Sequence, residues 1–118
     1  MGHQERKDAE KEAELHKTLI NPYIVKYEDS FKESMKLNIL LEYMENQDLG
    51  VHIKKQGGWP LKEEKIWKYF IQACLGLQYL HARKILHRDI KTINLFMGKN
   101  DTIKIGDLGV AKKMQDWA

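Results

Sequence analysis

The stretch His87-Arg88-Asp89-Ile90-Lys91-Thr92-Ile93-Asn94, followed further along by Asp107-Leu108-Gly109, decides how the rest of this chain is interpreted. Asp89 is able to accept a proton, Lys91 and Asn94 follow it closely, and Asp107 adds a second carboxylate just before a glycine. Phosphoryl transfer needs a base for the attacking hydroxyl, cations for the developing charge and oxygen ligands for Mg²⁺. This stretch supplies the base and both oxygen ligands.

Length and composition limit what surrounds this stretch. The chain has 118 residues, of which 42% are apolar and 31% are charged. This length suits one small domain with a modest core, and the composition is that of a globular rather than a disordered protein. The net charge of +3 comes from 20 basic and 17 acidic residues, an excess too weak and too mixed to indicate a nucleic-acid partner.

The cysteine content and the N-terminus favour a cytoplasmic protein. Cys74 is the single cysteine, which excludes an internal disulfide and suits a reducing compartment. No apolar run approaches the roughly 18–20 residues of a membrane span, so no membrane partner is expected. Residues 1–7 contain no apolar secretory segment, and Arg6 stands where a myristoylation signal beginning at Gly2 requires Ser or Thr.

Apolar periodicity and chain breakers predict a mixture of helices and strands. A charged helix is expected over residues 5–19, and Asn21-Pro22 ends it because the residue before proline avoids the helical region. A hairpin is expected next, with a short strand at 24–27, a polar turn at 28–35 and a strand at 37–43. The remaining predicted elements are a short helix at 48–56, a long helix at 62–82 and two strands at 95–97 and 102–105.

The long helix is expected to be buried as the central element of the domain. One apolar stripe runs through it, and a second stripe lies beside the first, so most of its circumference is apolar. Gly76 within the helix predicts a close crossing with another element. The stripes consist of Ile66, Phe70, Ala73, Leu77 and Leu80, and of Trp67, Ile71 and Cys74.

His-Arg-Asp, four further residues and Asn, followed by Asp-Leu-Gly, resembles the catalytic-loop and magnesium-loop signature of protein kinases. The resemblance covers nearly the whole chain from Glu5 onward and implies an α+β, protein-kinase-like fold that is partial. Lys91, two places after Asp89, resembles the serine/threonine class. The sequence from Lys84 to Phe96, together with Asp-Leu-Gly, is most similar to that of the NIMA-related kinases.

This resemblance implies ATP and Mg²⁺ as cofactors and a protein serine or threonine as substrate. Asp89 would accept or orient the proton of the substrate hydroxyl, and Lys91 would hold the γ-phosphate. Asn94 and Asp107 would ligate Mg²⁺. These residues form the expected catalytic and metal-binding set.

The same resemblance implies where the nucleotide lies. Leu41 would be the gatekeeper beside the adenine, and the backbone of Glu42 and Met44 would form the adenine-binding hinge. Asp48 would lie near the ribose, and Phe96 would form the floor beneath the adenine. Glu12, ten residues before Pro22, occupies the position of the glutamate that pairs with the nucleotide-binding lysine in this family.

The chain departs from the family pattern at both ends. It contains no Gly-x-Gly-x-x-Gly and no Val-Ala-Ile-Lys strand, so Glu12 has no family lysine within these residues. Residues 1–43 are expected to form part of the N-terminal lobe and residues 44–118 the hinge and the start of the C-terminal lobe, with the later part of that lobe absent.

Two functional hypotheses follow. The first is a piece of a serine/threonine protein kinase that has negligible activity alone and a partly exposed core. The alternative is a non-catalytic, kinase-like module that binds a partner or regulates an intact kinase. Cytoskeletal or ciliary association follows from the NIMA-related resemblance alone, and nothing in the sequence indicates an oligomeric state.

Overall fold

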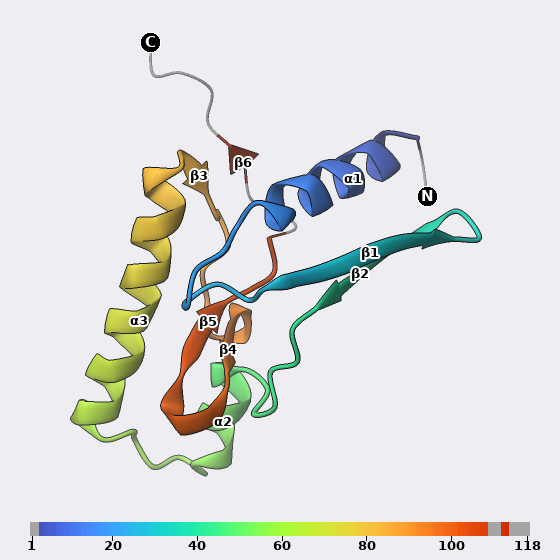
Figure 1. Cartoon of the computed structure of the whole chain (residues 1–118). Coiled ribbons are helices and arrows are strands. Elements are labelled where there is room, and N and C mark those ends of the chain that lie inside the picture. Colours follow the sequence, from blue (N-terminus) through green and yellow to red (C-terminus); the bar gives the residue numbers. More distant parts are fainter. Residues whose placement is uncertain (1–2, 109–111, 114–118) are drawn as a thin grey trace.

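The computed structural model describes residues 3–108 and 112–113 of the chain (Figure 1). The first elements are α1 (His3–Lys17), β1 (Tyr27–Glu33), β2 (Lys36–Leu41), α2 (Leu49–Lys55) and α3 (Glu63–Ala82). They are followed by β3 (Ile85–Leu86), the 3₁₀ turn η1 (Thr92–Asn94), β4 (Leu95–Met97), the 3₁₀ turn η2 (Lys99–Asp101), β5 (Ile103–Ile105) and β6 (Lys112–Lys113). Gly2 and Gly109, which belong to two of the motifs considered above, lie outside the described residues.

The described strands pair into three small antiparallel sheets, which are β1 with β2, β3 with β6, and β4 with β5. The segment that follows α1 connects two of these sheets. Ile24 forms a parallel bridge with Ile105 of β5, and the Val25 N–H donates to the Ile105 carbonyl at 2.9 Å. Helices and small antiparallel sheets confirm the predicted α+β class.

The hairpin differs from its prediction. The polar turn expected at 28–35 is wrong, because β1 continues to Glu33 and the turn is confined to Ser34 and Met35. Both turn residues have positive φ angles, 48° and 67°. The hairpin projects away from the rest of the molecule (Figure 1), so polar side chains are tolerated on both of its faces and no apolar alternation marks β1. β3 and β6 were not predicted, since strands of two residues carry no periodic signal.

The core lies where the β4–β5 pair packs on one side of α3, with β5 next to the helix (Figure 1). Gly76 allows the close crossing that the sequence predicts: a Cβ at this position would lie 2.8 Å from Ile105 Cδ1 and 3.0 Å from the Tyr23 carbonyl oxygen. The most deeply buried side chains include Leu19, Ile24, Leu80, Ile85, Ile103, Ile105, Leu108 and His87.

The prediction that α3 is buried around most of its circumference is wrong for one side. The buried stripe consists of Tyr69, Ala73, Gly76 and Leu80. The opposite side carries large apolar residues that are 50–57% exposed, namely Ile66, Trp67, Phe70 and Ile71, and Cys74 is exposed with them. The sequence shows that these residues are apolar but not which of them have neighbours within the described residues. No helix in that part of the chain has the length and apolarity to span a membrane.

Candidate functional site

A cavity of about 720 Å³ opens between the hairpin, the segment that follows it, and the β4–β5 pair. Most of the residues that the sequence assigned to nucleotide or magnesium binding line this one cavity: Leu41, Glu42, Met44, Asp48, Asn94, Phe96 and Asp107. The sequence reasoning missed five further lining residues, which are Val25, Tyr43, Gln47, Val51 and Gly106. All but Val25 lie within three positions of a residue that was predicted, so sequence proximity was the available signal.

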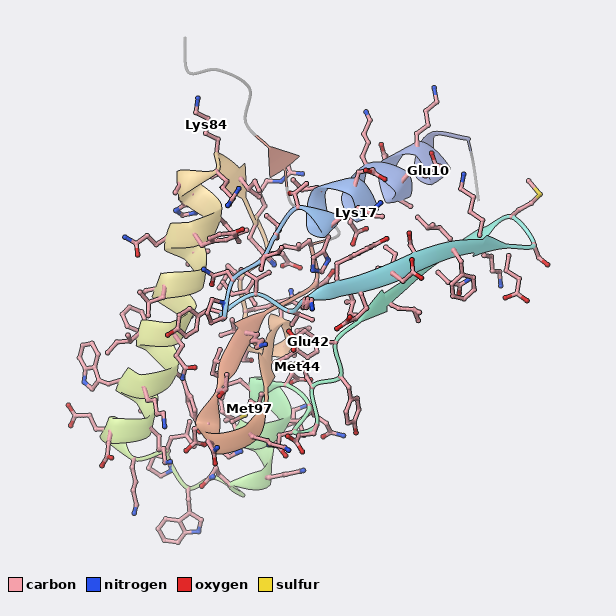
Figure 2. All side chains as sticks on the ribbon, viewed as in Figure 1. Glu10, Lys17, Glu42, Met44, Lys84 and Met97 are labelled. Atoms are coloured by element: carbon pink, nitrogen blue, oxygen red, sulfur yellow. The ribbon has the colours of Figure 1, made fainter. Side chains whose placement is uncertain are left out.

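The segment between β2 and α2 forms one wall of the cavity and is held by backbone hydrogen bonds at both ends. The Glu42 N–H donates to the Lys26 carbonyl at 2.9 Å, and the Asn46 N–H donates to the Met97 carbonyl at 3.1 Å. Figure 2 shows Glu42 and Met44 one after the other along this segment, with Met97 close by in β4. The backbone groups of this wall are therefore fixed relative to β4.

The carboxylate of Glu42 forms an ion pair with Lys104 of β5. The Lys104 Nζ lies 2.8 Å from Glu42 Oε1 and 2.9 Å from Oε2, and the Lys26 N–H also donates to Oε1 at 2.7 Å. Both side chains are only 22% exposed. Lys104 was missed from the sequence because it lies 62 positions from Glu42 and belongs to no motif.

Phe96 and Gly106 together form the floor. A Cβ at Gly106 would lie 2.6 Å from Phe96 Cε2, so a glycine is needed for the ring to lie against this backbone. The Gly106 N–H donates to the Asn94 carbonyl at 2.9 Å. At the other side of the cavity Asp48 caps α2, because its Oδ1 accepts from the Val51 N–H at 2.9 Å.

A chain of hydrogen bonds fixes the loop that carries Asp89. The Asp89 N–H donates to His87 Nδ1 at 3.1 Å, so the proton of this buried ring is on Nε2, which donates to the Gly106 carbonyl at 2.7 Å. Asn94 is 3% exposed, and its Nδ2 donates to the Asp89 carbonyl at 2.8 Å and to Asp89 Oδ2 at 3.2 Å. These bonds connect Asp89, Asn94 and the strand end before Asp107 into one unit.

Lys91 lies beside Asp89, with its Nζ 3.6 Å from Asp89 Oδ1. These two side chains are 53% and 37% exposed, so solvent can reach them. Arg88 and Asp107 adopt positive φ angles of 70° and 51°. Non-glycine residues rarely adopt such angles, and they persist where the surrounding structure determines them, often at functional sites.

Glu12 does not line the cavity, but it lies close enough to Asp107 for the two carboxylates to interact. Partial burial raises the pKa of Glu12, and the negative charge of Asp107 raises this pKa further. One turn further along α1, the buried His16 is bonded through Nε2 to the Val25 carbonyl at 2.6 Å. Val25 lines the cavity, so the His16 bond connects α1, which also carries Glu12, to the cavity wall.

Comparison with known proteins decides the family. The family description "Protein kinase domain" matches residues 1–117 of the chain. The chain belongs to the protein kinase family. The predicted resemblance is therefore confirmed, and the α+β elements described above are part of a protein kinase fold.

Protein kinases of the NIMA-related serine/threonine type are among the relatives of this chain. The chain is 40% identical over 112 residues to serine/threonine-protein kinase Nek1 of Mus musculus, covering 95% of the chain and 9% of that protein. It is 40% identical over 114 residues to Nek5 of Homo sapiens (96% and 16%) and 46% identical over 103 residues to human Nek11 (86% and 16%). The chain therefore spans less than a fifth of the length of these three relatives.

Proposed function

We propose that this chain carries the nucleotide site, the magnesium ligands and the catalytic loop of a serine/threonine protein kinase that transfers the γ-phosphate of ATP to a protein hydroxyl. One observation carries the proposal. A single cavity is lined by the residues expected at the adenine and by those expected at the magnesium ion, and Asp89 is hydrogen-bonded to one of the latter.

At one end of the cavity we assign the adenine to the wall that contains Glu42 and Met44 and to the floor made by Phe96. Leu41, at the end of β2, lines the inner part of this wall as the gatekeeper. Asp48 is assigned to the ribose: its Oδ1 caps α2, which leaves Oδ2 for a hydroxyl group.

At the other end Asn94 and Asp107 are assigned as the magnesium ligands. The fit of these residues to the ion is supported by the hydrogen bonding of Asn94: both bonds described for its side chain use Nδ2, so Oδ1 remains for a cation. Carboxylate and amide oxygens suit Mg²⁺, which also keeps waters and phosphate oxygens as ligands. A site with two protein ligands does not require a group of three or more acidic, histidine or cysteine side chains. The described residues contain no such group that could hold a metal ion. When bound, the ion neutralises charge that develops on the phosphates.

Asp89 is the proposed proton acceptor. Its carboxylate is held by Asn94 on one oxygen and lies near the Lys91 ammonium on the other, so a substrate hydroxyl between them would meet a base and a cation together. Lys91 would hold the γ-phosphate. Glu12 would form an ion pair with the nucleotide-binding lysine of the family, and such a cation would oppose the burial and the Asp107 charge that raise the pKa of Glu12.

We further propose that the 118 residues alone bind nucleotide weakly and transfer phosphate at a negligible rate. In this family the glycine-rich cover, the lysine and the substrate-binding helices act through positioning and charge stabilisation. The alternative is a non-catalytic kinase-like module, which the intact Asp89, Asn94 and Asp107 disfavour. A protein substrate, a cytoplasmic location and a cytoskeletal or ciliary association are proposals from the family likeness.

A chimera separates the two functions. The chain replaces the matching 112-residue segment of mouse Nek1, and phosphate transfer from Mg-ATP to a protein substrate is measured. We expect activity in the chimera and a loss of about 10²–10⁴-fold on Asp89→Asn, with Glu14→Gln on the exposed side of α1 as the unchanged control. A folded chimera that binds Mg-ATP but transfers no phosphate would support the non-catalytic module. Translating the coding region upstream of Met1 offers an independent check, because a glycine-rich loop and a Val-Ala-x-Lys strand there favour the enzyme.

A further inference from the structure

The ion pair between Glu42 and Lys104 joins two parts of the cleft, the segment that follows β2 and the strand β5. Glu42 begins the wall that follows β2, and Lys104 is the central residue of β5. Lys104 lies opposite Phe96 in the β4–β5 register and three positions before Asp107. Figure 2 shows Glu42 on the segment that passes β4 and β5. The pair therefore connects the wall assigned to the adenine with the strand that leads into the residue assigned to magnesium.

The contacts are those of a specific, partly desolvated pair. Lys104 Nζ contacts both carboxylate oxygens of Glu42 at 2.8 and 2.9 Å, and Oε1 also accepts from the Lys26 N–H at 2.7 Å. With each side chain only 22% exposed, water screens this interaction far less than a surface pair. Charge-assisted bonds of this geometry fix position as well as contributing energy.

Other links between these parts are backbone bonds. The far end of the wall is bonded to β4, because the Asn46 N–H donates to the Met97 carbonyl at 3.1 Å and the Met97 N–H donates to the Gln47 carbonyl at 2.7 Å. The start of the wall is bonded to the segment after α1. The Glu42 N–H donates to the Lys26 carbonyl, and the Val25 N–H donates to the Ile105 carbonyl, each at 2.9 Å. These bonds hold the far end of the wall on β4 and connect its start to β5 only by way of the segment after α1, whereas the Glu42–Lys104 pair attaches the start of the wall to β5 directly.

We propose that Glu42 and Lys104 act as a positioning pair that sets the distance between the adenine wall and the magnesium end of the cleft. The inference rests on the proposed nucleotide-binding function. Neither charged group is required to touch the nucleotide. A ligand that contacts only the adenine wall is insensitive to this distance, but Mg-ATP, which reaches both ends, depends on it because small displacements weaken simultaneous contacts.

The test compares adenosine with Mg-ATP. Dissociation constants for both are measured by NMR titration of the 118-residue chain, for the parent and for Lys104→Met. We expect the affinity for Mg-ATP to fall about tenfold and that for adenosine to change less than about twofold. Glu42→Gln, which keeps an oxygen for the Lys26 N–H, should give the same selective loss, the double variant should be no worse than either, and Lys104→Arg should restore Mg-ATP binding.

A matched control uses a second ion pair, which joins α3 to the turn before β5. Lys65 of α3 is bonded to Asp101 of η2 and does not line the proposed nucleotide cavity. Lys65→Met should lower the thermal midpoint without changing the ratio of the two dissociation constants. If Lys104→Met weakens both ligands equally, or leaves Mg-ATP binding unchanged, the positioning role is wrong while the proposed function stands. If neither ligand shifts the backbone amides of the parent chain at millimolar concentration, the proposed nucleotide site fails and the inference falls with it.

Discussion

Two glutamates, Glu42 in the wall of the cleft and Glu12 on α1 near Asp107, have contrasting surroundings. Glu42 has a cation at hydrogen-bonding distance from both of its carboxylate oxygens, and that cation is supplied by a strand of the same chain. Glu12 lies near a second carboxylate, that of Asp107, and its pKa is raised by burial and by this like charge. Glu42 thus has a cation partner among the described residues, whereas the charge that shifts the pKa of Glu12 is the negative charge of Asp107.

The largest effect on stability is expected at the Glu42–Lys104 ion pair. Lys104→Met should lower the free energy of unfolding by about 2 kcal/mol, because it leaves the Glu42 carboxylate, which is only 22% exposed, without its cation. Urea denaturation at pH 7 measures this change. Lys17→Met is the matched control, because the exposed Lys17–Glu14 pair at 3.8 Å should contribute less than about 0.5 kcal/mol. Equal losses in the two variants would contradict the contrast.

A smaller effect is expected from His16, one turn beyond Glu12 on α1. Desolvation lowers the pKa of this buried histidine below its ordinary value of 6.5. The unfolded chain therefore binds a proton that the folded chain does not, and stability should fall as the pH drops from above 6.5 toward the folded pKa. Each unit of depression contributes about 1.4 kcal/mol to that fall.

Urea denaturation between pH 7.5 and 5.5 measures this dependence. In His16→Gln, which retains an N–H for the Val25 carbonyl, the decline should be shallower by the contribution of one histidine. An identical pH profile in the variant would exclude His16 as its source.

The smallest effect on stability is expected at Glu12, and it tests whether the charge that acts on this carboxylate is unfavourable. Glu12→Gln should leave stability at pH 7 unchanged or raise it by up to about 0.5 kcal/mol, because it removes a partly buried charge that faces Asp107. The same change at Glu42 should be destabilising, since it weakens the bonds to Lys104. Urea denaturation of the two glutamine variants in parallel gives the comparison. A marked loss of stability in Glu12→Gln would show that this carboxylate already has a stabilising cation.

The local sequence was sufficient to predict the loop that carries Asp89 and most residues that line the cavity. Asp89, Asn94 and Asp107 belong to a motif whose spacing reflects one loop and one hairpin. The residues of the wall between β2 and α2 directly follow one apolar strand. The positions of these groups relative to one another come from Ile105, whose backbone bonds to Val25, and from Gly76, which allows α3 to approach β5.

Long-range and context-dependent features could not be predicted. The Glu42–Lys104 pair joins residues 62 positions apart, and no pattern in either strand indicates it. The exposure of Trp67 and Phe70 on α3 depends on which neighbours are present, a property that apolar periodicity does not report. The strand character of 28–33 was hidden because a projecting hairpin needs no apolar face.

The central claim is that the cavity of about 720 Å³ binds Mg-ATP through the assigned residues. Titration of the ¹⁵N-labelled chain with Mg-ATP, followed by backbone amide shifts, tests this claim most directly. We predict that the largest shifts occur at 42–44, 94–96 and 106–107, and that Asp107→Asn removes the magnesium dependence of binding. Shifts confined to other parts of the chain, such as the polar cavity near His52 and Asn100, or no shifts at millimolar nucleotide, would contradict the account.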